Sequence, residues 1–132
     1  MQKFLRLEFI DSSPDVALFL LRVWLGGSML WLHGWGKLLN LFHGKLSFPD
    51  PLGLGSTPSF LLTVFAEVIC SLLLVIGLCT RWAALILAFT MGVAFFIVNK
   101  TDWKDGELAW LYFGGFLVLF CAGAGRFSVD RK

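Results

Sequence analysis

The residues that could carry chemistry lie inside apolar segments of the chain. Arg22, His33 and Lys37 fall on one helical face of residues 16–39, because they recur with Gly26 and Met29 at spacings of three and four. Glu67 is the acid in the interior of the next apolar segment. A charge at the centre of a bilayer costs at least ~2.5–3.5 kcal/mol, so such groups normally face the inside of a helix bundle. We therefore expect all four side chains to point inward and to have partners.

Arg22 and Glu67 are predicted to form a pair. A guanidinium stays charged under nearly all conditions, so Arg22 needs an acceptor within the membrane. A bidentate contact with Glu67 would satisfy both groups and fix the packing of residues 16–39 on residues 60–78. Lys37 lies near the outer end of its segment, where its ammonium is expected to reach the lipid headgroups.

Two interpretations of these polar groups stay open. In the first they are structural, a polar contact that holds helices together where lipid provides no hydrophobic drive. In the second, Glu67 or His33 is a catalytic group that exchanges a proton with a bound ligand, since imidazole titrates near neutrality. The second interpretation predicts a ligand-binding site made of Arg22, His33, Lys37 and Glu67.

Composition identifies the elements that position these residues. Hydrophobic residues make up 58% of the chain and charged residues 15%, compared with roughly 45–50% and about 25% in a soluble domain. We predict an all-α integral membrane protein, a four-transmembrane-helix bundle that forms a single membrane domain over residues 1–132. The predicted spans are residues 16–39, 60–78, 82–98 and 107–122, with a loop at 40–59 and a short interfacial segment at the N-terminus.

An even number of spans places both termini on one side of the membrane. Basic residues are more numerous on that side, which favours cytoplasmic termini. The predicted inner side holds Lys3, Arg6, Arg81, Arg126, Arg131 and Lys132, and the outer side holds Lys37, Lys45, Lys100 and Lys104.

Charge and cysteine content argue against other classes of protein. The net charge of +2 is small and the basic residues are scattered, so the footprint of a nucleic-acid binder is missing. Cys70, Cys79 and Cys121 form no CxxC pair, so neither a disulfide framework nor a zinc site is suggested. No metal or haem ligand set is expected.

Several motifs together resemble a known family. They are LLRVWLGGSMLWLHGWGKL, then FPDPLGLGS, then FAEVICSLLLVIGLCTR, and finally ELAWLYFGGFLVLFCAGAGRFSVD. In this order they resemble the DoxX family of small four-helix bacterial membrane proteins, over residues 16–130. The family pattern also falls on Arg81 after the second span, on Glu107 at the start of the fourth and on Arg126 beyond its end.

The resemblance implies the bacterial inner membrane and a link to oxidoreductase assemblies. One branch of the family is similar to a subunit of a thiosulfate:quinone oxidoreductase, and another is associated with superoxide dismutase and a sulfurtransferase in an oxidative-stress complex. We expect the lipid bilayer, redox enzymes and further copies of the chain as partners, and a quinone as the cofactor.

Three functions remain in competition. The first is a membrane subunit of a redox complex that holds a quinone-like ring near Arg22, His33 and Glu67. The second is a small proton-coupled transporter that uses Glu67, against which stands the predicted fixed counter-ion Arg22. The third is a membrane anchor or docking subunit without chemistry of its own.

Overall fold

The first span is one long helix with a wide turn inside it. The computed structural model describes residues 1–8, 13–44, 53, 55–98, 104 and 106–130, and no strand occurs among them. Helix α2 (Pro14–Met29) continues through a π-helical segment, η1 (Leu30–Gly34), into α3 (Trp35–Phe42). The Ser13 hydroxyl accepts a hydrogen bond from the Val16 amide at 3.3 Å, which caps the start of α2. The whole rod is longer than the predicted span 16–39.

The second and third spans also contain a π-helical segment, and the fourth is a regular α-helix. The second comprises α4 (Ser56–Val64), the π-helical segment η2 (Phe65–Cys70) and α5 (Ser71–Ile76). The third comprises α6 (Thr80–Val93) and a third π-helical segment, η3 (Ala94–Val98), and the fourth is α7 (Glu107–Ala122). The helices Pro14–Phe42, Thr57–Ile76 and Thr80–Ile97 are long and apolar enough to cross a membrane, and the apolar α7 is shorter, at 16 residues.

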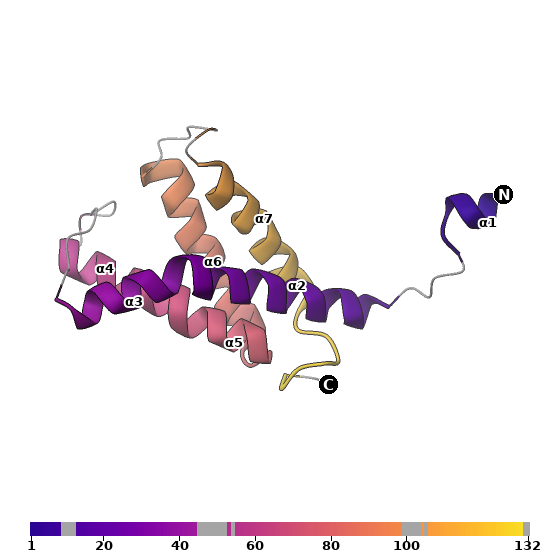
Figure 1. The fold of residues 1–132 in the computed structure, drawn as a ribbon, viewed down its shortest axis with the longest axis horizontal. Helices are drawn as coiled ribbons and strands as arrows, with labels where there is room; N and C mark the ends of the chain where they lie inside the picture. Colours follow the sequence, from indigo (N-terminus) through magenta and orange to yellow (C-terminus); the bar gives the residue numbers. More distant parts are fainter. Residues whose placement is uncertain (9–12, 45–52, 54, 99–103, 105, 131–132) are drawn as a thin grey trace.

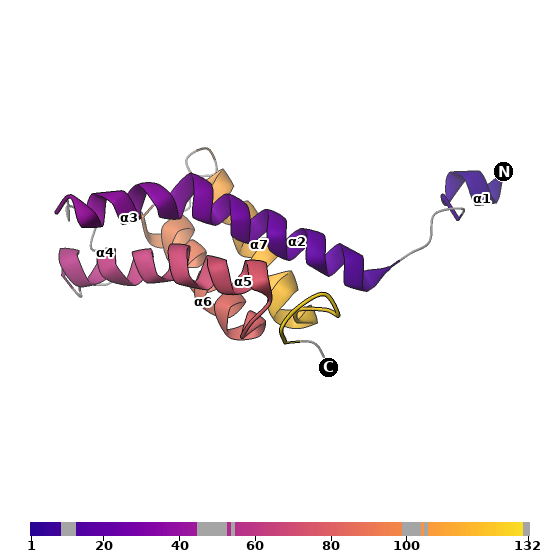
Figure 2. The same cartoon turned by 60° about the horizontal axis from the view of Figure 1, so that its bottom comes forward.

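Two antiparallel helix pairs make up the bundle. Figures 1 and 2 show the first span lying alongside α4 and α5, and α6 lying alongside α7 at an angle to the first pair. The end of α5, the start of α6, the end of α7 and the start of α2 all lie at one end of the bundle, which we call the tail end. The short helix α1 (Gln2–Leu5) has no buried residue and lies apart from the bundle.

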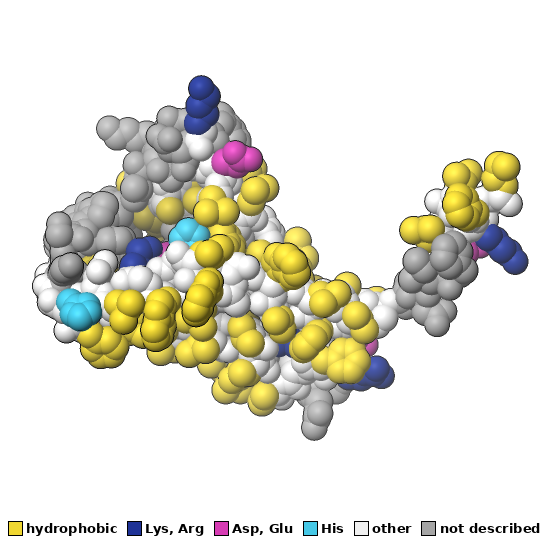
Figure 3. All heavy atoms as spheres, viewed as in Figure 1, with side chains coloured by type: hydrophobic (Ala, Val, Ile, Leu, Met, Phe, Trp, Pro, Cys, Tyr) yellow, Lys and Arg dark blue, Asp and Glu magenta, His cyan; other side chains and the backbone are white. Residues whose placement is uncertain are grey.

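The core lies between these two pairs of helices. All four spans contribute to it, and most of its side chains are small or aliphatic. They are Met29 from α2, Ala66, Cys70 and Leu74 from the second span, Ala83, Ala84, Leu87, Ala88 and Met91 from α6, and Tyr112, Phe116 and Leu119 from α7. Large apolar side chains cover much of the outer surface, and Figure 3 shows them along the first span. Trp24 and Trp31 are both 74% exposed, as expected for a helix that faces lipid. The all-helical membrane fold expected from the sequence is confirmed.

Candidate functional site

The first and second spans cross most closely at Gly34. A Cβ atom added to this glycine would lie 2.6 Å from the Glu67 carbonyl oxygen, so a larger residue would push the two backbones apart. Gly34 ends η1, and Glu67 lies inside η2. Single π-helical turns of this kind occur frequently at functional sites, where they displace side chains from the regular helical register. The crossing therefore brings two wide turns, one carrying His33 and one carrying Glu67, against each other.

Glu67 is paired with a lysine at this crossing. The Lys37 ammonium Nζ donates to Glu67 Oε2 at 2.5 Å. The Glu67 side chain is 3% exposed and that of Lys37 is 27% exposed, so the carboxylate is buried and the amine lies at the edge. The expectation that Lys37 reaches the headgroups instead is wrong, because a buried carboxylate within reach is a stronger partner than the interface.

His33 lies one helical turn before Lys37 and completes the cluster. Its ring packs edge to face on the ring of Tyr112 from α7, with centroids 5.6 Å apart. It is close enough to Glu67 and Lys37 to interact electrostatically with both. The ring nitrogen Nε2 is buried and has no hydrogen-bond partner among the described residues. A buried ring nitrogen without a partner is uncommon in proteins and indicates a missing partner.

Arg22 belongs to a different network, and the predicted pair with Glu67 is wrong. Its guanidinium Nη1 donates to the carbonyls of Leu74 at 2.9 Å and Val75 at 3.1 Å, and Nη2 donates to the carbonyl of Phe127. The first two carbonyls belong to the last turn of α5, where helix carbonyls lack partners within the helix and the dipole is negative. Arg22 is fully buried, and its hydrogen bonds connect α2 to the end of α5 and to the segment after α7.

The tail end is closed by the segment that follows α7. Both Asp130 carboxylate oxygens accept backbone amides at the start of α6, from Cys79 at 2.9 Å and from Thr80 at 2.6 Å. Burial raises the pKa of Asp130, but these amide hydrogen bonds and the charge of Arg22 outweigh it and hold the pKa below its ordinary value. The segment also pairs with the turn after α5, since the Asp130 amide donates to the Gly77 carbonyl at 2.8 Å.

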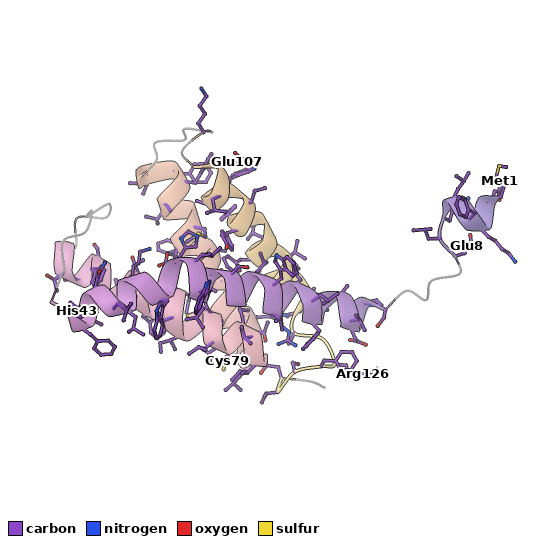
Figure 4. All side chains as sticks on the ribbon, in the orientation of Figure 1. Met1, Glu8, His43, Cys79, Glu107 and Arg126 are labelled. Atoms are coloured by element: carbon purple, nitrogen blue, oxygen red, sulfur yellow. The ribbon has the colours of Figure 1, made fainter. Side chains whose placement is uncertain are left out.

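The remaining predicted residues are spread over both ends of the bundle. Arg81 donates to the Cys121 carbonyl at 3.2 Å, and the Arg126 amide donates to Asp15 Oδ1 at 3.0 Å, both at the tail end. Glu107 lies in the first turn of α7, at the opposite end (Figure 4). The structure thus brings His33, Lys37 and Glu67 together and places Arg22, Arg81 and Arg126 elsewhere.

Sequence reasoning missed Tyr112 as a member of the site. This tyrosine is 6% exposed and its ring contacts that of His33. Its phenol interacts with the hydroxyl of Ser28 on α2. The position of Tyr112 one and a half turns into an apolar segment was an available signal, because a buried phenol needs a polar partner.

Comparison with known proteins identifies the chain's family. The family model described as DoxX matches residues 17–100. The chain belongs to the DoxX family. It is also 34% identical over 112 residues to an uncharacterized protein of Haemophilus influenzae, a match that covers 79% of this chain and 81% of that protein. No solved structure matches the chain.

The DoxX match includes most of the site. Arg22, His33, Lys37 and Glu67 fall within the matched residues, and Tyr112 and Asp130 lie beyond them. In this DoxX chain the cluster of His33, Lys37, Glu67 and Tyr112, from here on the polar cluster, combines an imidazole, an ion pair and a phenol inside a membrane-spanning bundle. Such a set can hold a polar ligand atom and relay a proton to or from it.

Proposed function

We propose that the chain is the membrane subunit of a quinone-linked redox complex, and that the polar cluster holds the head group of a quinone-like ligand. The observation that carries this proposal is the buried His33 Nε2, which lies beside the Lys37–Glu67 ion pair and has no hydrogen-bond partner in the part of the chain that the structure describes. A buried polar group without a hydrogen bond costs about 1–3 kcal/mol, which a ligand oxygen at this point would offset.

The residues present fit a quinone in both of its oxidation states. A quinone carries carbonyl oxygens that become hydroxyl groups when it takes up two electrons and two protons. Imidazole serves either form, because a protonated Nε2 donates to a carbonyl and an unprotonated Nε2 accepts from a hydroxyl. Tyr112 forms an aromatic wall against His33. In Figure 3, basic, acidic and histidine side chains adjoin beside the first span.

Within this arrangement the chain's own residues hold and move protons. His33 is the group that faces the ligand oxygen, and the opposite charges of Glu67 and Lys37 both lie close enough to act on its imidazole. Lys37 is partly exposed, so it connects the buried Glu67 to the edge of the bundle. Electrons come from a redox enzyme that associates with the membrane subunit. We place the protein in the bacterial inner membrane with cytoplasmic termini, in keeping with the charge bias of its loops.

One observation favours a proton-coupled transporter as the second candidate. The sequence argument against it was a permanent counter-ion, but the partner of Glu67 is Lys37 rather than Arg22. An ammonium can lose its proton and a guanidinium does not, so this ion pair could open during a transport cycle.

Direct ligand binding separates the two candidates. Purified protein in detergent is titrated calorimetrically with a short-chain ubiquinone, and His33→Phe is compared with His43→Phe, which changes the exposed histidine that follows α3. The quinone proposal predicts binding in the wild type and in His43→Phe, and binding weakened at least about ten-fold in His33→Phe. No binding to the wild type, together with proton flux in liposomes that Glu67→Gln abolishes, would establish the transporter instead.

A further inference from the structure

A cleft of about 720 Å³ opens at the tail end, on the opposite side of Arg22 from the polar cluster. The start of the first span, the start of the third and the end of the fourth all contribute to it. Its walls come from the first turn of α6, the segment after α7, and Asp15 near the start of α2. Figure 4 shows Cys79 and Arg126 near this end of the molecule.

Two cations and two anions line the cleft, and they are not paired with each other. Arg81 and Arg126 form no ion pair with an acid in the described part of the chain. The acids instead accept backbone amides, Asp130 from Cys79 and Thr80, and Asp15 from Arg126. Arg81 uses one nitrogen for the Cys121 carbonyl and keeps further N–H groups for other acceptors. The cleft thus offers separate positive and negative groups with no net charge.

The cleft lies where lipid headgroups are found. Thr80 is the first residue of a helix long enough to cross the membrane, and Ala122 is the last of the fourth apolar helix. Trp82 lines the cleft and is 70% exposed, and indole rings favour the boundary between hydrocarbon and headgroups. A phosphate at this depth would meet guanidinium groups, which bind phosphate through parallel hydrogen bonds.

We propose that this cleft binds the headgroup of a zwitterionic phospholipid with a primary ammonium, of the phosphatidylethanolamine class. Arg81 and Arg126 bind the phosphate, and Asp15 with Asp130 accepts the ammonium. A phosphatidylglycerol headgroup would present neutral hydroxyl groups and leave both carboxylates without a counter-charge, and a quaternary ammonium could not donate hydrogen bonds to them. The site is separate from the polar cluster and does not depend on the quinone proposal.

Native mass spectrometry of the full chain tests the site. The protein is released from detergent after equilibration with phosphatidylethanolamine, phosphatidylcholine or phosphatidylglycerol of identical acyl chains. Phosphatidylethanolamine is expected to bind about ten-fold more tightly than the other two lipids, because each of those lacks one charge-assisted hydrogen bond between a primary ammonium and a carboxylate. Arg126→Gln should weaken the binding of all three lipids at least about ten-fold, because it removes a contact to the phosphate that they share, and Arg6→Gln, which changes an exposed arginine that follows α1, should leave their binding unchanged.

A pair of variants at Arg81 separates loss of the site from loss of the fold. Arg81→Lys keeps the charge, so it should retain more of the affinity for phosphatidylethanolamine than Arg81→Gln does, at an unchanged circular dichroism spectrum. Asp15→Asn should bring phosphatidylethanolamine down to the affinity of phosphatidylcholine. The proposal is overturned if phosphatidylglycerol binds as tightly as phosphatidylethanolamine in the wild type. It is also overturned if folded Arg126→Gln keeps the wild-type affinity for phosphatidylethanolamine, or if soluble O-phosphoethanolamine binds as tightly as the lipid.

Discussion

Lys37 and Glu67 form an ion pair of 2.5 Å across the crossing of the first two spans, with the carboxylate almost fully buried. The two members are unequal, because Lys37 lies at the edge and Glu67 inside. Removal of the cation leaves a buried charge without a partner, whereas removal of the acid leaves an amine that can turn outward.

Lys37→Met is therefore expected to lower the free energy of unfolding by about 3 kcal/mol, and Glu67→Gln by less. The double variant Lys37→Met/Glu67→Gln should recover most of the loss, because it leaves no unpaired charge. Unfolding by sodium dodecyl sulfate titration in mixed micelles measures all three. A double variant as unstable as the sum of the single variants would show that the two side chains do not interact.

Arg22 and Glu67 are expected to be energetically independent. They occupy separate hydrogen-bond networks, Arg22 with backbone carbonyls of α5 and the tail and Glu67 with Lys37. A double-mutant cycle with Arg22→Gln and Glu67→Gln should give a coupling energy within about 0.5 kcal/mol of zero. The cycle also decides between the structure and the pair predicted from sequence, since a direct pair would give a coupling well above that value.

Gly34 should tolerate no side chain. Gly34→Ala is expected to destabilise the bundle by about 1–3 kcal/mol, because its Cβ would meet the Glu67 backbone. Gly36→Ala is the matched control in the same span, since a Cβ there would meet nothing within 4 Å. It should be neutral or stabilising by up to about 1 kcal/mol. Equal melting temperatures for the two variants would contradict the close crossing.

Asp130 should make stability depend on acid pH. Its pKa lies below the ordinary value of 3.8, because backbone amides and Arg22 outweigh the effect of burial. The charged carboxylate thus stabilises the fold fully above about pH 4, and this contribution is lost as the pH falls through the lower pKa of the folded state.

Thermal melts followed by circular dichroism between pH 2.5 and 7 test this dependence. Asp130→Asn should lower the free energy of unfolding by about 1 kcal/mol at neutral pH, and it should reduce the fall in stability between neutral and acid pH. Glu8→Gln, in the exposed turn that follows α1, should leave the profile unchanged. If the loss of stability at acid pH is the same in Asp130→Asn as in the wild type, other carboxyl groups cause it and the prediction is wrong.

Hydrophobicity was enough to predict the class of fold, because long apolar segments allow few structures in a membrane. Helical spacing likewise indicated that Arg22 and His33 share one face. Spacing could not identify their partners. It describes the faces of a single helix, whereas pairing depends on how far the neighbouring helix is shifted along its own axis. In an antiparallel pair, Arg22 is level with the last turn of the second span, whose carbonyls at Leu74 and Val75 are acceptors that no residue type reveals.

The wide turns at η1 and η2 were equally hidden. No proline marks either segment, and the sequences LWLHG and FAEVIC read as ordinary apolar helix. The two wide turns can be recognised only in the folded bundle, where Gly34 lies against the Glu67 carbonyl. The sequence position of Tyr112 could indicate a buried phenol but not its contact with His33, because that contact depends on how the α6 and α7 pair packs on the first span.

The central claim is that His33 Nε2 contacts a quinone oxygen, and infrared difference spectroscopy of a carbonyl-labelled quinone tests it most directly. The protein is loaded with ¹³C-carbonyl ubiquinone in detergent, and the carbonyl stretch is compared in the wild type, His33→Phe and His43→Phe. We predict one carbonyl band shifted to lower frequency by hydrogen bonding in the wild type and in His43→Phe, and its return to the free position in His33→Phe. A carbonyl band at the free position in the wild type, or a shifted band that survives in folded His33→Phe, would contradict the account.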